Sequence, residues 1–303
     1  MCLLVLAQVG LSFFWQIPLI FLLALVGVDV TANIMGYQWL SGVMVPLSTA
    51  LPFVAYLLIC RKDPVDYLKF QRVGFTGGVL CVLGGLALVL LGNYPAMAVG
   101  DFFGSFGYNG GSGYVSTAES WEAILLELAV TAVLVPFMEE FVFRGVILSS
   151  LRPYGIGFSI VASALIFGLA HLDLSSTVFA VIAGLVFGFL YARTNNLWLT
   201  VWIHGLNNAI AVIGSHTDYL FGSWASTMDV ALMLVPIGLG LISLVLLAIF
   251  RRGMFLTRTS PQYDGPAYPL DATESALGIV RAPVFWVVVG LMVAYSILSS
   301  LAL

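Results

Sequence analysis

The chain has 303 residues, of which 61% are hydrophobic and only 9% are charged, and its formal net charge is −4. Soluble globular proteins carry about 25% charged residues, so the composition excludes an ordinary soluble domain and indicates several membrane-spanning helices. The three cysteines, at positions 2, 60 and 81, form no CxxC pair and no even set, which excludes a disulfide framework and a cysteine metal site.

Long apolar runs define the predicted elements in chain order. A helix that crosses a bilayer needs about 20 mostly apolar residues. Candidate runs lie at 2–28, 38–60, 75–92, 121–150, 157–172, 176–192, 197–214, 228–250 and 283–303. We therefore expect an all-α fold: a polytopic transmembrane helical bundle of about nine spans, or about eight if the short fifth run does not cross.

Basic residues predict the orientation of these spans. The loops at 29–37, 93–120, 173–175 and 215–227 contain no Lys or Arg. The basic residues outside the spans are Arg61, Lys62, Lys69, Arg72, Arg152, Arg193, Arg251, Arg252, Arg258 and Arg281. Cytoplasmic loops carry an excess of Lys and Arg, so we expect an integral protein of the cell membrane with its N-terminus in the cytoplasm.

The spans divide the chain into three expected regions. Residues 1–120 hold the first transmembrane helices and an extracytoplasmic loop at 93–120. Residues 121–214, spans four to seven, hold the polar residues that indicate a catalytic core. Residues 215–303 hold the last helices, joined by a cytoplasmic linker at 251–282 that is too poor in apolar residues to form a core of its own.

Span four places two acids and one base inside an apolar helix. A charged side chain at the bilayer centre costs at least about 2.5–3.5 kcal/mol, so such residues indicate function. Glu140 and Arg144 are four residues apart and can pair on one helix face, whereas Glu139 points about 100° away. We expect a structural Glu140–Arg144 pair and a Glu139 that faces something else. A packing network that uses both glutamates stays open as the alternative.

Pro136 precedes this group by one turn. Proline removes a backbone hydrogen bond, which can bend a helix and open a cavity. In span six, by contrast, Ala180, Gly184 and Gly188 form a stripe of small residues. Such stripes are typical of close helix packing, so we expect span six to let its neighbours approach one another.

Spans five and seven each carry a histidine. Phe167 and His171 lie one turn apart in span five, and His204 and Asn208 lie one turn apart in span seven, with Asn207 beside them. Taken singly, a histidine in an apolar helix is more often a packing residue, and an asparagine can simply hold helices together. Two histidines and an amide at the depth of a free carboxylate instead favour one constellation.

Such a constellation can hydrolyse an amide bond. A carboxylate beside an imidazole can take a proton from water, and a second histidine with an asparagine amide could donate hydrogen bonds to the developing oxyanion. No GxSxG motif suggests a serine enzyme, and no HExxH motif suggests a zinc peptidase. The third histidine, His216, falls in an expected outer loop.

Three ordered motifs in this region resemble those of the CPBP family of intramembrane proteases. This family includes the type II CAAX prenyl endopeptidases and the abortive infection proteins. The motifs EExxxR, FxxxH and HxxxN are matched by Glu139, Glu140, Arg144, Phe167, His171, His204 and Asn208. The resemblance covers about residues 121–214 and implies an intramembrane, glutamate-dependent peptidase.

The resemblance also implies a role for each residue. Glu139 would be the general base and His171 its partner in activating water, while His204 and Asn208 would form the oxyanion site. The supporting positions would be Glu140, Arg144 and Phe167. We expect no cofactor, although two histidines and a glutamate could in principle bind zinc. Expected partners are membrane lipid and a peptide or membrane-protein substrate, and no nucleic acid.

Two other functions stay open. A proton-coupled transporter could use Glu139 and the histidines as a relay, but it predicts charged groups at several depths and repeated helices. A membrane immunity or scaffold protein could keep the fold without catalysis. The intact motifs favour the peptidase over both.

Overall fold

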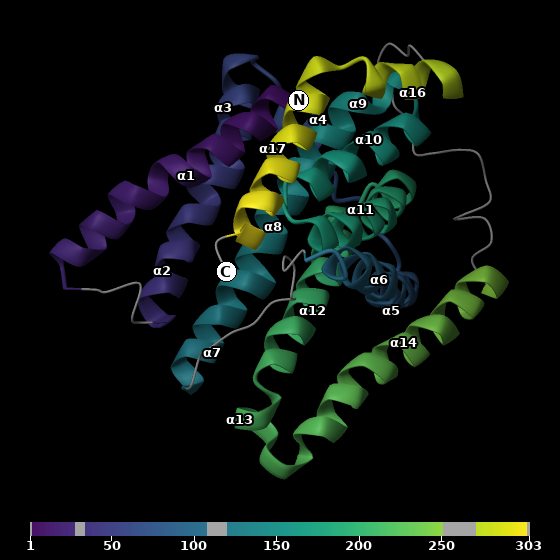
Figure 1. Ribbon diagram of the computed structural model, residues 1–303. Helices are drawn as coiled ribbons and strands as arrows, with labels where there is room; N and C mark the ends of the chain where they lie inside the picture. Colours follow the sequence, from purple (N-terminus) through teal and green to yellow (C-terminus); the bar gives the residue numbers. More distant parts are fainter. Residues whose placement is uncertain (1, 28–33, 108–119, 251–270, 302–303) are drawn as a thin grey trace.

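The computed structural model describes residues 2–27, 34–107, 120–250 and 271–301 (Figure 1). Within these ranges the regular structure is helical, apart from one isolated antiparallel bridge between Phe70 and Asn196. The expected all-α class is therefore confirmed.

The helices follow one another in three groups. The first contains α1 (Cys2–Leu25), α2 (Ile34–Val45), the π-helix η1 (Pro46–Ala50), α3 (Leu51–Ile59), α4 (Pro64–Tyr67), α5 (Phe75–Leu91) and α6 (Asn93–Gly104). The second contains α7 (Trp121–Leu128), η2 (Ala129–Leu134), α8 (Val135–Glu140), η3 (Phe141–Leu148), α9 (Ser149–Leu151), η4 (Arg152–Tyr154), α10 (Ile156–Leu169), α11 (Leu174–Thr194) and α12 (Leu197–Ser215). The third contains α13 (Thr217–Phe221), η5 (Gly222–Trp224), α14 (Ala225–Phe250), α16 (Ala272–Val280) and α17 (Pro283–Leu301).

Six helical stretches in the described ranges are long and apolar enough to cross a membrane, so the expected count of nine spans is not confirmed. They are Trp39–Ile59, Phe75–Gly104, Trp121–Tyr154, Leu174–Thr194, Leu197–Ser215 and Thr217–Phe250. The fifth expected span forms α10, whose 14 residues reach about 21 Å at 1.5 Å per residue. That is shorter than a hydrocarbon core of about 30 Å. The first and last expected spans are helical, as α1 and α17, but are not among the six.

Two segments expected to lack helices contain them. The stretch expected as a loop from residue 93 begins with α6, which packs against the start of α11: a Cβ on Gly100 would lie 2.6 Å from the Ser175 hydroxyl oxygen. The expected linker 251–282 includes α16, which begins with a capping box between Asp271 and Glu274. A capping box satisfies free backbone N–H groups at a helix start. Residues 108–119 and 251–270 lie outside the described residues.

Span four is one continuous helical stretch interrupted by two π-helical segments. The π-helix η2 ends just before Pro136, and η3 begins directly after Glu140. A π-helix bonds residue i to i+5, and such segments often occur at functional sites. Pro136 thus lies at the change from π-helix to α-helix, in the short α8 that carries both glutamates.

The small-residue stripe of span six packs against α10, as expected. A Cβ added to Gly184 would lie 2.9 Å from the Ala164 Cα atom, and one added to Gly188 would lie 3.2 Å from the Ile160 side chain. Close packing of this kind brings α10 and α11 together. It places Phe167, near the end of α10, against the residues of α11.

Helices α5 and α14 cross at a second pair of glycines, and α14 runs beside α5 in Figure 1. A Cβ on Gly240 would lie 2.3 Å from the Ala87 Cβ atom and 2.4 Å from the Leu83 carbonyl oxygen. A Cβ on Gly84 would lie 2.8 Å from the Leu244 side chain. The two helices can approach this closely only because both positions lack a side chain.

We predict that Gly240→Ala destabilises the protein by about 1–3 kcal/mol, the usual cost of overpacking a fitted contact. The matched control is Gly238→Ala on the same helix, where an added Cβ meets nothing within 4 Å. That control should be neutral or stabilise the helix by up to about 1 kcal/mol. The measurement is thermal unfolding of the purified variants in one detergent. Equal melting temperatures for both variants would contradict this account of the crossing.

Candidate active site

The Glu140–Arg144 pair predicted from helix geometry is present. An Arg144 Nη1 atom lies 3.0 Å from Glu140 Oε1, and both side chains are 0% exposed. The guanidinium carbon also lies 4.4 Å from the ring centroid of Phe167 and 4.9 Å from that of Phe187. A buried charge is tolerated when it is paired, so Glu140 and the two aromatic faces together hold Arg144 in the bundle.

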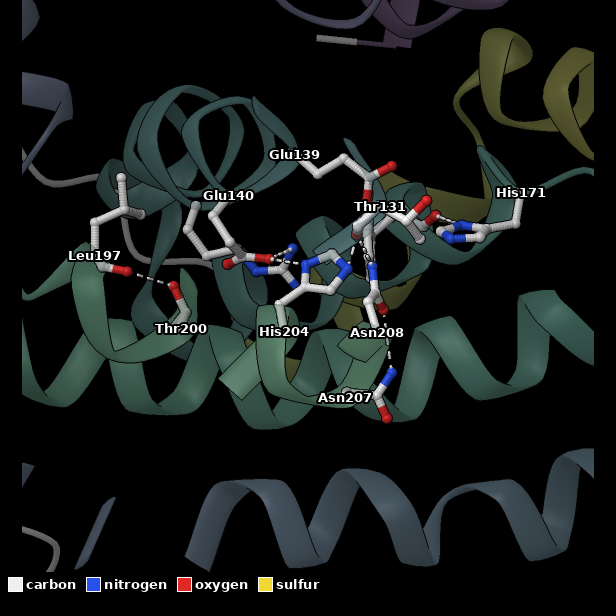
Figure 2. Close-up of polar contacts among 11 residues, drawn as sticks. Thr131, Glu139, Glu140, His171, Leu197, Thr200, His204, Asn207 and Asn208 are labelled. Atoms are coloured by element: carbon white, nitrogen blue, oxygen red, sulfur yellow. Dashed lines mark hydrogen bonds and ion pairs between the residues drawn. The ribbon is translucent and has the colours of Figure 1, made fainter. Parts of the chain in front are cut away.

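His204 lies between the two glutamates (Figure 2). Its Nδ1 atom is 3.1 Å from Glu140 Oε1, and its Nε2 atom is 3.7 Å from Glu139 Oε2. A carboxylate only accepts hydrogen bonds, so Nδ1 donates to Glu140. The 3.7 Å separation is longer than a hydrogen bond. The stacked ring of Phe187, 5.3 Å away, fixes the plane of the imidazole.

Glu139 differs from its neighbour in exposure. Its side chain is 20% exposed, against 0% for Glu140. Glu139 lines a cavity of about 110 Å³ between α8, α10, α11 and α12. The polar residues that line this cavity are Glu139, His171, His204, Asn207 and Asn208. The sequence-predicted candidates thus meet in one place, with Glu139 as the accessible carboxylate.

Phe167 connects the members of this group. Its ring centroid is 4.9 Å from that of His171 and 5.9 Å from that of His204, in edge-to-face arrangements. It is also 4.8 Å from the ring of Phe143. One aromatic side chain therefore contacts both histidines and the arginine, which gives the first residue of the FxxxH pattern a packing role.

His171 lies just past the end of α10, not within a span as its position in the apolar run suggested. Its side chain is exposed, and its Nδ1 atom is 2.9 Å from the Phe167 carbonyl oxygen. A carbonyl only accepts, so Nδ1 carries the hydrogen. In the neutral ring Nε2 is then left as an acceptor. The carboxylate of Glu139 approaches His204, while His171 shares the cavity with both.

The amide of Asn208 is anchored by the π-helix η2. Its Nδ2 atom donates to the Thr131 carbonyl oxygen at 2.9 Å. In the π register the carbonyl of Thr131 would bond to residue 136, but Pro136 has no N–H to give. The Thr131 carbonyl therefore lacks a π-helical partner and is free to accept from Asn208 on α12. The second hydrogen on Nδ2 is available to another acceptor.

Two polar contacts were not predicted from the sequence. Asn207 Nδ2 donates to Asn208 Oδ1 at 3.3 Å, which orients the anchored amide. Near the start of span four, Glu127 Oε2 lies 3.0 Å from Nε2 of His216, the residue that follows α12, and both residues are buried. His216 was expected in an outer loop. The sequence does contain a signal for this pair: Glu127 is an acid within an apolar run, and such a residue usually has a partner.

The long apolar helices indicate a polytopic membrane protein, and carboxylate, imidazole and amide groups line its smaller cavity. Residues 121–210 match the sequence model of the family described as "Type II CAAX prenyl endopeptidase Rce1-like". This match covers about a third of the chain and confirms the resemblance to CAAX protease-like membrane peptidases.

One relative supports the same assignment. The Bacillus subtilis (strain 168) protein named "Putative membrane peptidase YdiL" is 28% identical over 200 residues, which cover 65% of this chain and 80% of the relative. No solved structure matches the chain at a significant level.

We predict that Glu140→Gln lowers the free energy of unfolding by about 3–5 kcal/mol, because it strands the buried Arg144 charge. Glu139→Gln is the matched control one residue away, and it should unfold near the wild-type temperature since Glu139 is partly exposed. Thermal unfolding of both variants in detergent measures the difference. If Glu140→Gln is as stable as the wild type, the ion pair does not support the site.

Proposed function

We propose that this protein is an intramembrane endopeptidase of the cell membrane, with its N-terminus in the cytoplasm, that hydrolyses a peptide bond in a peptide or membrane-protein substrate. The observation that carries the proposal is the shared cavity: the accessible Glu139, both motif histidines and Asn208 line it together. The family match supports the reaction class. The loops free of Lys and Arg support the orientation.

In the proposed reaction Glu139 acts as the general base. It takes a proton from a water molecule as the water oxygen attacks the peptide carbonyl carbon. His171, whose Nε2 is an acceptor, holds the same water in place. The proton then passes from Glu139 to the leaving amine as the C–N bond breaks, which returns Glu139 to its carboxylate form.

The oxyanion of the intermediate would be held by His204 and Asn208. Asn208 has one amide hydrogen left beyond its bond to Thr131. His204 can donate from Nε2 only when both ring nitrogens carry protons. In that form the ring would donate from Nδ1 to Glu140 and from Nε2 to the oxyanion. Donors placed where charge develops lower the barrier of acyl transfer.

A proton relay is the second candidate, and one observation favours it. The buried Glu127–His216 pair lies twelve residues before Glu139, which is about 18 Å along a straight helix. Ionisable groups therefore occur at more than one depth of span four. The family assignment favours the peptidase, and a proton-flux measurement on the protein in liposomes separates the two.

We predict that Glu139→Gln lowers peptide cleavage by at least about 10²-fold, the usual contribution of a general base, while the protein stays folded. The assay is mass spectrometry of fragments from a peptide library incubated with purified protein. Proton flux that depends on Glu139, without any cleavage by the wild type, would favour the relay. A folded wild type with neither activity would favour the scaffold role.

The same cleavage assay tests whether the reaction requires zinc. Among the described residues no three His, Cys, Asp or Glu side chains lie close enough to hold a metal ion. We therefore propose that cleavage survives prolonged treatment with a strong chelator. Loss of cleavage, with recovery on addition of zinc, would instead make His171 and His204 ligands.

We predict that Asn208→Ala lowers turnover by about 10²–10³-fold, as loss of one oxyanion donor does, with little change in KM. Asn207→Ala should cost less, because the Thr131 carbonyl still anchors Asn208 in that variant. The measurement is kcat and KM on one cleaved peptide. Full turnover in Asn208→Ala with loss in Asn207→Ala would show that the donor belongs to the other amide.

A further inference from the structure

A second and larger cavity lies away from the candidate active site. It is bounded by α5, α11 and α14 and has a volume of about 600 Å³, within the range of about 300–1,000 Å³ typical of ligand pockets. Its wall is almost entirely apolar and includes Cys81, Gly85, Leu185, Phe189 and Leu247. None of its lining residues lines the smaller cavity.

This cavity opens toward the lipid. All three helices belong to stretches that can span a membrane, and its rim residues Leu88, Leu185 and Phe189 are more than one-third exposed. A bound water needs two to four polar partners, which the apolar wall does not supply. An empty space would lose the dispersion contacts of its lining atoms. A hydrocarbon chain from the bilayer needs no polar partners and restores the dispersion contacts of the lining atoms.

Positive charge lies at one end of the same cavity. The guanidinium carbon of Arg193, one turn beyond Phe189, is 5.4 Å from the ring centroid of that lining residue. Arg193 is in the last turn of α11, on the side that the basic residues predict to be cytoplasmic. The cytoplasmic leaflet holds anionic lipids, which attract basic residues near the membrane surface.

Further basic residues are held near Arg193 by the chain around Asn195. The backbone N–H of Gln71 donates to the Asn195 carbonyl at 2.9 Å, which brings Arg72 to this end of α11. Arg152 donates from Nη2 to the Asn195 side chain at 2.6 Å. Lys69 also lies in this segment but faces Asp66 at 3.9 Å. Among the described residues named here, three arginines and the Lys69–Asp66 pair give this end of α11 a positive balance of charge.

We propose that this cavity binds an anionic phospholipid, with an acyl chain between α5, α11 and α14 and the headgroup phosphate at Arg193. The apolar wall favours a lipid acyl chain, and Arg193 favours a negatively charged headgroup. The site is separate from the peptide-cleaving residues, so the proposal stands whether or not the proposed reaction is correct.

The test uses the full-length protein in mixed micelles with phosphatidylglycerol that carries a diazirine on one acyl chain. Cross-links, mapped by mass spectrometry, should fall in 81–88, 185–190 and 244–248. An excess of unlabelled phosphatidylglycerol should remove them at a concentration about five-fold lower than phosphatidylcholine does, which is the factor one surface arginine contributes toward anionic lipid.

Two variants and two controls sharpen the result. Leu185→Trp should fill the cavity and abolish labelling, whereas Leu234→Trp, at an exposed position of α14 outside the cavity, should not. Arg193→Gln should remove the preference for phosphatidylglycerol, and Arg193→Lys should keep most of it. Lys62→Gln, at an exposed position past α3, should leave it unchanged. Circular dichroism confirms that each variant is folded.

Three outcomes would overturn the proposal. Equal competition by the two lipids in the wild type would remove the role of charge. Cross-links outside these three segments would place the lipid elsewhere. Cross-links between two copies of the chain through the same segments would mean that the cavity is covered by another protein molecule and not by lipid.

Discussion

The ion pair between Glu140 and Arg144 sets the position of the other polar groups. An unpaired guanidinium in a bundle without water would be very costly, so its carboxylate partner cannot move away. That carboxylate also accepts a hydrogen bond from His204. The rings of Phe167 and Phe187 pack against both the Arg144 guanidinium and the His204 imidazole. The imidazole is therefore held from three directions. Glu139, one residue along, is left as the partly exposed carboxylate that lines the cavity.

Pro136 connects the backbone of span four to the chemistry on α12. Because proline has no N–H, the carbonyl of Thr131 has no partner in the π register and takes the amide of Asn208 instead. Gly205 allows this approach, since a Cβ there would lie 2.6 Å from the Ala132 carbonyl oxygen. Pro136 on span four and Gly205 and Asn208 on α12 together fix the contact between the two helices.

The sequence predicted the parts of the site that depend on helical spacing. The Glu140–Arg144 pair follows from a four-residue separation, and the packing of Gly184 follows from its place in a small-residue stripe. Contacts between distant segments could not be predicted in this way. Neither the position of His204 between two glutamates nor the Glu127–His216 pair has a local pattern, because both depend on how whole helices are packed.

Predictions that rested on the length of apolar runs were less accurate. Apolar composition does not show where a helix ends. The apolar run at 157–172 continues past Leu169, where α10 ends, so it wrongly placed His171 inside the helix. The sequence from residue 93 read as a loop because it is rich in Gly and Tyr, yet its first part packs as α6 against α11. A capping box at Asp271 marks the start of α16, and this local signal could have been recognised beforehand.

The shortness of α10 has a consequence for hydration. A helix of about 21 Å cannot match a hydrocarbon layer of about 30 Å, so the layer must thin or admit water beside it. The last carbonyls of any helix lack partners within the helix and are costly to leave bare in lipid. At the end of α10 the His171 imidazole satisfies the Phe167 carbonyl, and the backbone N–H groups that follow the helix satisfy its neighbours. The exposed side chain of His171 therefore links this end of α10 to the cavity, and the proposed hydrolysis, which consumes one water molecule for each bond broken, could draw its water from there.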